Sequence, residues 1–317
     1  MSTTEPQTDT AAGGLRKGRL GVAGIVFFVV AAAAPLVGMT GAVPVAIVLG
    51  NGAAAPGAYL FVGITLLLFS VGYAAMSQRV TNAGAFFAYV GRGLGKHAGV
   101  ASAFVSILAY LAIQLAIYGF FGGVIAAQVG ILPWWAWTLI AWVVVTALSL
   151  LSVDVGAKVL GVLLSFELLA LIVTSIAILV TGGPEGLNFA ASFSPDKILI
   201  GGLAGSAGIA FAFAFASFIG FEATAIYGEE SKDPKRIVPR ATYLAVIVIT
   251  VLFALVSFAM VTGMGSSVVV DQTLERSGGL VDPAAVLFTL AGEYVGPWMA
   301  TVMSFLVLSS LFAGLLA

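Results

Sequence analysis

The segment Ala216-Ser217-Phe218-Ile219-Gly220-Phe221-Glu222 places a small polar residue, a glycine and a carboxylic acid inside an otherwise apolar run, Leu199–Gly228. Glycine weakens a helix, and an ionisable group at membrane depth costs about 2.5–3.5 kcal/mol or more. Backbone groups freed in lipid need partners, so a break survives only inside protein or against a polar cavity. If the run crosses a membrane, the segment predicts an interrupted helix.

The composition of the whole chain supports a membrane setting. Of its 317 residues, 61% belong to the AVILMFWYC set and only 9% are charged, whereas soluble domains average roughly 25% charged residues. The mean hydropathy is +1.13. We therefore predict an all-α polytopic membrane protein. The net charge of −1 argues against nucleic acid as a partner. With no cysteine and one histidine, neither a metal site nor any other cofactor is expected.

The few charges divide the chain into long uncharged stretches, and a membrane span needs about 20 apolar residues. The longest stretches must each hold two helices, divided where Gly, Pro and Asn cluster, at Asn51–Gly57 and at Gly130–Pro133. We predict eight spans: Leu20–Leu49, Ala58–Gln78, Gly99–Val129, Pro133–Ser152, Val159–Thr181, Leu199–Gly228, Ala241–Met264 and Gly296–Ala317.

The basic residues predict the orientation, because cytoplasmic loops carry an excess of Lys and Arg. With a cytoplasmic N-terminus, residues 1–18 form a disordered cytoplasmic tail ahead of a single transmembrane domain, 19–317, in the cell membrane. Two basic residues, Lys197 and Arg276, then lie outside. The other eleven lie inside: Arg16, Lys17, Arg19, Arg79, Arg92, Lys96, Lys158, Lys232, Lys235, Arg236 and Arg240.

A second break is predicted near the N-terminus, where Pro35, Gly38, Gly41 and Pro44 fall inside one apolar stretch. A simple kink is the alternative, because Pro and Gly are common in membrane helices. Interruptions in the first and sixth helices, which run in opposite directions, are typical of inverted-repeat transporters. Half-helix N-termini offer N–H donors to an anion and unwound carbonyls face a cation. A zwitterion such as an amino acid would match both.

Glu167 and Glu222 are the two acids placed within the predicted spans. Intramembrane ionisable residues are functional candidates by default, and burial disfavours the charged form of a carboxyl group. Both are therefore candidates for proton coupling. The alternative is a neutral structural acid that hydrogen-bonds to a neighbouring helix.

Three motifs resemble the amino acid–polyamine–organocation (APC) superfamily of permeases. Gly220-Phe221-Glu222-Ala223, followed by Glu229–Arg240, resembles its sixth-helix signature; Gly38-Met39-Thr40-Gly41 resembles its first-helix break; and Arg79–Tyr89 resembles the segment after helix two. The resemblance implies a five-plus-five inverted-repeat, leucine-transporter-like fold. The first repeat would cover about 20–181 and an incomplete second repeat about 199–317, the chain stopping within the eighth of usually twelve helices.

The resemblance also implies the site. Backbone N–H groups around Met39, Thr40 and Gly41 would bind a substrate carboxylate. Backbone carbonyl groups around three further residues would bind the amino group of the substrate. Phe215 or Phe218 would act as the gate, since relatives often carry an aromatic residue where Ala216 stands. Glu222 occupies a position where some relatives carry a glutamate thought to sense protons. Glu167 stands where several relatives carry a lysine in their fifth helix. The three residues whose carbonyl groups would bind the amino group are Ala216, Ser217 and Ile219.

We therefore predict a secondary active transporter for an amino acid or related amine, with proton-coupled symport or exchange. Its partners would be the small-molecule substrate, protons and the lipid bilayer. An intramembrane enzyme is disfavoured, because the predicted spans contain no Asp, Lys or His. An inactive fragment or a non-transporting membrane partner remains the alternative.

Overall fold

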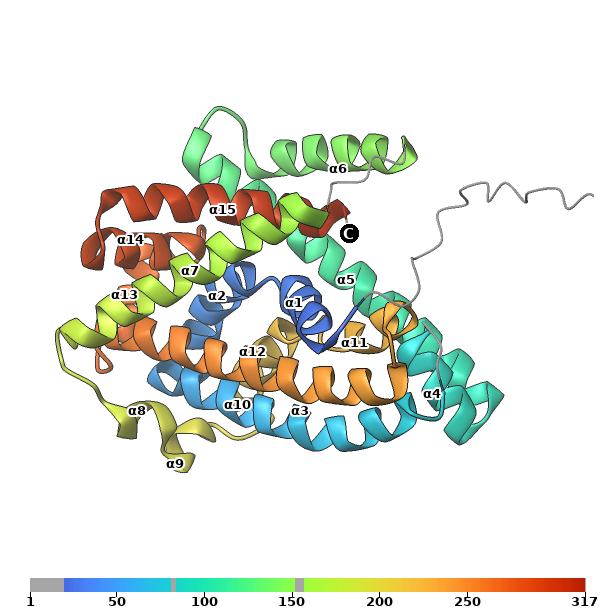
Figure 1. The fold of residues 1–317 in the computed structure, drawn as a ribbon. Coiled ribbons are helices and arrows are strands. Elements are labelled where there is room, and N and C mark those ends of the chain that lie inside the picture. Colours follow the sequence, from blue (N-terminus) through green and yellow to red (C-terminus); the bar gives the residue numbers. More distant parts are fainter. Residues whose placement is uncertain (1–19, 81–83, 152–156, 317) are drawn as a thin grey trace, which may run out of the picture.

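The computed structural model describes residues 20–80, 84–151 and 157–316, so the predicted tail, residues 1–18, lies outside the described part. In that part the chain forms helices and no named strand (Figure 1). The helices are α1 (Val22–Ala32), α2 (Pro35–Val45), η1 (Ala46–Asn51), η2 (Gly52–Ala54), α3 (Ala55–Ser77), α4 (Ala85–Leu94), α5 (Lys96–Val129), α6 (Trp134–Leu150), α7 (Ala157–Thr181), α8 (Phe189–Phe193), α9 (Pro195–Ile198), α10 (Ser206–Ser217), α11 (Ala223–Ile226), η3 (Tyr227–Glu230), α12 (Pro234–Met264), α13 (Val269–Arg276), α14 (Ala284–Tyr294) and α15 (Pro297–Leu316).

Five helical runs in the described residues are long and apolar enough to cross a membrane, and four shorter apolar helices accompany them. The prediction of a polytopic, all-helical membrane protein is therefore confirmed. The five runs are Pro35–Ser77, Lys96–Val129, Gly161–Thr181, Pro234–Met264 and Pro297–Leu315.

The helix boundaries differ from the predicted spans. The predicted span Leu20–Leu49 is divided into α1, α2 and the first residues of η1, and the run Leu199–Gly228 has α10 as its one long helix. The predicted spans do not include α14, which has 11 residues. Such a helix is too short to span a bilayer, and Glu293 near its end made the region resemble a loop.

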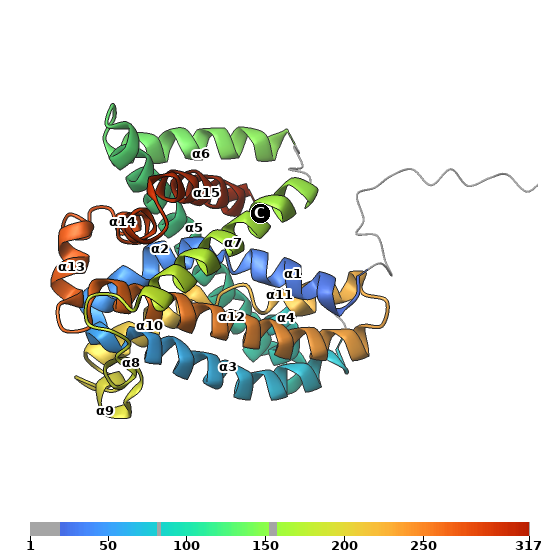
Figure 2. The ribbon, with the colours of Figure 1, turned by 60° about the vertical axis from the view of Figure 1, so that its left-hand side comes forward.

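Helices α3 and α12 run side by side along the molecule in both views, and the N-terminal helices lie above them (Figure 2). The core lies between this pair and the N-terminal helices. Gly63 of α3 allows close packing, because a Cβ there would overlap the Thr250 side chain of α12. Leu36, Tyr59 and Phe253, from α2, α3 and α12, are fully buried. By contrast, α6 lies at the outside of the bundle (Figures 1 and 2).

The two ends of the bundle carry different connections. The end with α4 and α11 also holds Leu20, which forms an isolated bridge with Ser231. The amide of Leu20 donates to the Glu230 carbonyl, and the amide of Lys232 donates to the Leu20 carbonyl, both at 3.2 Å. The helices α8, α9 and α13 lie at the opposite end (Figure 1).

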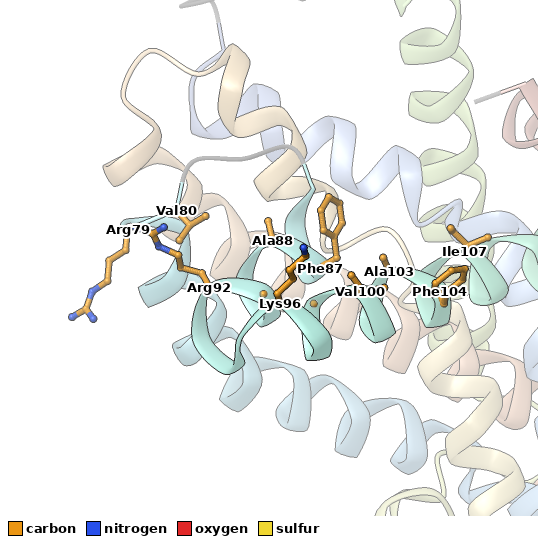
Figure 3. A pocket seen from close by; sticks show the side chains of 12 residues that line it. Arg79, Val80, Phe87, Ala88, Arg92, Lys96, Val100, Ala103, Phe104 and Ile107 are labelled. Atoms are coloured by element: carbon orange, nitrogen blue, oxygen red, sulfur yellow. The ribbon is translucent and has the colours of Figure 1, made fainter.

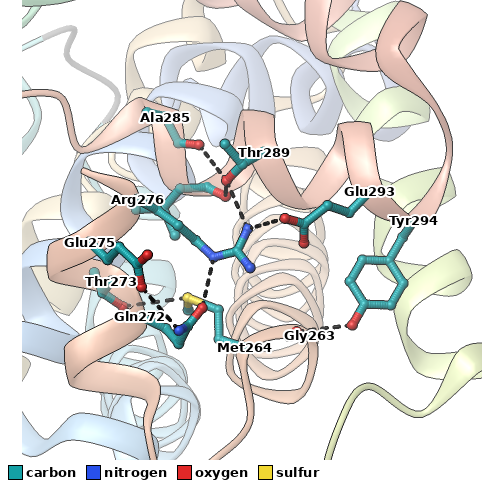
Figure 4. A network of polar contacts seen from close by, with 11 residues as sticks. Gly263, Met264, Gln272, Thr273, Glu275, Arg276, Ala285, Thr289, Glu293 and Tyr294 are labelled. Carbon is teal, nitrogen blue, oxygen red and sulfur yellow. Dashed lines mark hydrogen bonds and ion pairs between the residues drawn. The ribbon is translucent and has the colours of Figure 1, made fainter. Parts of the chain in front are cut away.

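At that opposite end, polar contacts fasten the connections. Arg276 of α13 donates to Glu293 of α14 at 2.7 Å and to Thr289 at 3.2 Å (Figure 4). Glu185, which follows α7, accepts hydrogen bonds from the hydroxyl groups of Ser266 and Ser267 after α12. These contacts join segments that the spans alone would leave independent.

Candidate functional site

The first interruption lies between α1 and α2. Ala34 adopts a left-handed conformation, with φ of 41°, and α2 begins at Pro35. Proline disfavours a helical residue before it and fits the first turn of a helix, where its missing N–H costs nothing. The helix therefore ends before Pro35, the first residue of the predicted break, and upstream of Gly38–Gly41, where the resemblance implies the break.

The predicted carboxylate-binding residues Met39, Thr40 and Gly41 lie inside α2. Helical hydrogen bonding occupies their amides, and the Thr40 hydroxyl donates back to the Leu36 carbonyl at 2.6 Å. The glycines are used for packing instead. A Cβ at Gly38 would contact the Ser217 side chain at 3.5 Å, and one at Gly41 would lie 3.1 Å from Phe120.

The second interruption separates α10, which ends at Ser217, from the short α11, which begins at Ala223. Within it Gly220 has a φ of +110°, which L side chains rarely adopt. A Cβ on Gly220 would lie 2.8 Å from the carbonyl carbon of Ala32 and 2.9 Å from the amide nitrogen of Ala33. The second stretch therefore touches the end of α1 and the first residue of the first interruption, backbone against backbone.

Each interruption leaves backbone groups without a partner among the described residues. At the start of α2, no acceptor is recorded for the amides of Leu36 and Val37, since Gly38 is the first to bond back to Ala34. In the second stretch, the carbonyls of Ser217 and Ile219 accept no recorded hydrogen bond. Free donors at the start of α2 and free acceptors in the second stretch thus belong to neighbouring segments.

Side chains from α3 and α12 support Ser217 and the predicted gate residues. The Tyr59 hydroxyl lies 3.1 Å from Ser217 Oγ, and Ser217 also donates to the Phe213 carbonyl at 2.9 Å. Phe218 is buried and packs edge-on against Phe253, with ring centroids 5.2 Å apart. Phe215 is 41% exposed and projects from α10, as does the exposed Ala216. The two aromatic residues therefore occupy different environments.

Glu222 is buried and held by three elements. Tyr110 of α5 donates its hydroxyl to Oε1 at 2.7 Å, and the amide of Gly220 donates to Oε2 at 2.9 Å. The Tyr73 hydroxyl of α3 donates to the Glu222 backbone carbonyl, also at 2.7 Å. Both carboxylate oxygens are thus satisfied, and the side chain ties the second interruption to α5.

Glu167 is buried on α7, where its Oε2 accepts a hydrogen bond from Ser310 of α15 at 3.1 Å. No hydrogen bond recorded among the described residues joins Glu167 to Glu222, and they share no partner. The two acids therefore belong to separate clusters.

Sequence reasoning missed Tyr59, Tyr73, Tyr110 and Ser310. A signal was available for Tyr59 and Tyr73, because a buried tyrosine hydroxyl needs a hydrogen-bond partner and a polar neighbour supplies it. Tyr110 is 48% exposed and gives no such signal. No such signal identifies Ser310, since serine commonly bonds to its own helix. Its contact with Glu167 spans 143 residues of sequence.

Comparison with known proteins decides the family. Residues 24–317 match the family described as amino acid permease. The chain belongs to the amino acid permease family. This agrees with the APC resemblance seen in the sequence motifs. The helical architecture and the apolar runs are what membership of a multi-pass permease family requires.

Two curated relatives are similar to this chain. An uncharacterized transporter of Legionella pneumophila is 24% identical over 280 residues, which cover 82% of this chain and 55% of that protein. The low-affinity putrescine importer PlaP of Escherichia coli K12 is 26% identical over 209 residues, which cover 64% of this chain and 45% of that protein. The chain thus spans about half the length of the curated relatives it matches.

Proposed function

We propose that the protein acts in secondary active transport of an amino acid or related amine across the cell membrane. The observation that carries the proposal is the contact of the second non-helical stretch, at Gly220, with Ala32–Ala33, where α1 ends and the first interruption begins. Family membership supports transport as the activity, and a relative named as a putrescine importer supports amines beside amino acids. On this proposal the five-plus-five inverted-repeat fold applies, with the chain holding one repeat and part of the second.

The substrate would lie between the two interruptions. The free amides at the start of α2, those of Leu36 and Val37, suit a carboxylate, because a helix N-terminus favours an anion. The free carbonyls of Ser217 and Ile219 suit an ammonium group. We retain Met39, Thr40, Gly41 and Ala216 as wall residues on the same helices, and the exposed Phe215 is the better candidate for the gate.

Proton coupling is proposed for both buried acids. Glu222 is connected to the second interruption through the Gly220 amide and to α5 through Tyr110, so a change in its protonation would alter how these elements are held. Glu167 is connected to α15 through Ser310. Protonation there would change the α7–α15 contact without touching the substrate stretches.

Uptake into proteoliposomes tests the proposal. The full-length protein is reconstituted, a pH gradient is imposed with and without sodium, and labelled amino acids and putrescine are added. We expect accumulation that follows the pH gradient. Failure to accumulate or exchange any amino acid or amine would reject the transport proposal and favour a non-transporting membrane partner.

Matched variants separate transport from coupling. Glu167→Gln should weaken the proton dependence of uptake while substrate exchange persists. Glu275→Gln, which changes an exposed acid of α13 in the same way, should behave as the parent. Unchanged coupling in Glu167→Gln would remove that residue from the mechanism.

A further inference from the structure

A groove lies away from both interruptions, between the end of α3, α4 and the first turns of α5 (Figure 3). Its volume is about 600 Å³. Arg79, Arg92 and Lys96 line it, and none of its described lining residues is acidic. None of these three forms a recorded ion pair among the described residues. The groove therefore carries positive charge that no acidic side chain among its described lining residues neutralises.

A glycine contact builds this groove. A Cβ at Gly99 of α5 would lie 2.7 Å from the Cα of Gly91 in α4, so the two helices meet backbone to backbone. Gly95, with a φ of +94°, makes the turn between them. Arg92 and Lys96 are thereby held on either side of one tight turn, while Arg79 extends outward at the mouth (Figure 3).

The remaining wall of the groove is apolar and continues along α5. Phe104 and Ile107 line it and are exposed. The 34 residues of α5 are about 50 Å long at roughly 1.5 Å per residue, whereas a hydrocarbon core is about 30 Å thick. The start of α5 at Lys96 therefore reaches the headgroup layer, and Phe104 and Ile107 lie further toward the hydrocarbon.

We propose that this groove binds an anionic phospholipid, with its phosphate on Arg79, Arg92 and Lys96 and an acyl chain along Phe104 and Ile107. Basic pockets between membrane helices on the cytoplasmic side suit phospholipid headgroups, and a free phosphate would leave the apolar wall uncovered. The inference depends on the membrane setting and not on transport, so its test is read without any substrate.

Native mass spectrometry of the purified full-length protein tests the proposal. Phosphatidylglycerol, cardiolipin, phosphatidylcholine and inorganic phosphate are added in separate arms. We expect retained adducts of the two anionic lipids. Replacing all three basic residues by Gln should lower phosphatidylglycerol occupancy roughly tenfold or more, because each basic residue near an anionic headgroup contributes. Equal retention of phosphatidylcholine by the parent, or of inorganic phosphate, would overturn the proposal.

A matched triple variant controls for net charge. Lys232→Gln, Lys235→Gln and Arg236→Gln remove three exposed charges from another connection at the same end of the bundle, and should leave lipid occupancy unchanged. Equal losses in the two triple variants would reject the groove as the site. If the groove variant does not purify as one species, Arg92→Gln alone must lower occupancy and Arg92→Lys must restore it. Absence of either effect would also reject the proposal.

Discussion

Gly220 connects the two interruptions, and both of its special properties have the same origin. Its positive φ and its position against the Ala32–Ala33 backbone are tolerated because it lacks a Cβ. Its amide also donates to Glu222. A single residue therefore joins helix packing, the non-helical backbone and the buried acid.

Gly220→Ala should destabilise the protein by about 1–3 kcal/mol, the usual cost of holding a side chain in a disfavoured backbone region. The new methyl group would also overlap Ala32 and Ala33. The thermal unfolding midpoint of the purified protein measures the effect. Gly72→Ala is the control, because nothing lies within 4 Å of a Cβ there, and it should leave the midpoint unchanged or slightly raised. A similar loss in both variants would contradict the packing role of Gly220.

The connections between helices depend on contacts outside the predicted spans. At the end of the bundle that carries α13, Glu185 accepts hydrogen bonds from the Ser267 hydroxyl and amide and from the Ser266 hydroxyl. These bonds favour the ionised carboxylate and hold the pKa of Glu185 below its ordinary value of 4.5. The connection after α7 is thus fastened to the end of α12 by a charge.

The stability contributed by Glu185 should depend on pH with a defined sign. Because its pKa is lower in the folded state, the stabilisation is present above about pH 4.5 and is lost as pH falls through the folded-state pKa. Glu185→Gln should therefore unfold at a lower temperature than the parent at pH 7, and the difference should shrink toward pH 3. Thermal unfolding across this range measures it.

Ser304→Ala is the control for that series, because the Ser304 hydroxyl bonds only within its own helix, to the Thr301 carbonyl at 2.9 Å. Any change it causes should stay constant with pH. A difference between Glu185→Gln and the parent that does not vary with pH would rule out the proposed role of the carboxylate charge.

The ion pair between α13 and α14 should couple these helices measurably. Arg276 is 17% exposed and lies 2.7 Å from Glu293, so a double-mutant cycle with Arg276→Met and Glu293→Gln should give about 1 kcal/mol. The comparison pair, Arg236 and Asp233, is 3.7 Å apart with an 82% exposed arginine, and should give under about 0.5 kcal/mol. Equal coupling energies would show that exposure does not decide the strength of the two pairs.

At the scale of the whole molecule, the basic residues and the fold give one consistent arrangement. The N-terminal strand-like contact of Leu20, the helix α4 and the start of α12 lie at one end, whereas α8, α9 and α13 lie at the other (Figure 1). Lys232 and Lys197 belong to opposite ends. The positive-inside rule then favours placing the Lys232 end in the cytoplasm.

Single-cysteine labelling of this 317-residue chain tests the orientation without preparing a cysteine-free background, because the chain contains no cysteine. Lys197→Cys should react with an impermeant maleimide on intact cells. Lys232→Cys should react only after permeabilisation. Both positions are exposed, and the unmodified parent should remain unlabelled. The reverse pattern would invert the topology.

The class of the protein and most helix positions were predictable from the sequence, because hydrophobicity and span length are summed locally along the chain. The identity of the buried acids was predictable for the same reason, since charges at membrane depth are rare. The short helix α14 was not predicted, because its length and flanking charges are as typical of a loop as of a packed helix.

The exact place of the first interruption and the partners of the acids were decided only by the tertiary structure. A glycine in a membrane helix can break it or can admit a neighbour, and the sequence does not distinguish these outcomes. Gly38 packs on Ser217 and stays helical, whereas Gly220 leaves the helix against Ala32. In the same way, Glu167 meets Ser310 only because α7 and α15 are packed together. Local composition determined which residues must be buried, and long-range packing determined which residues they contact.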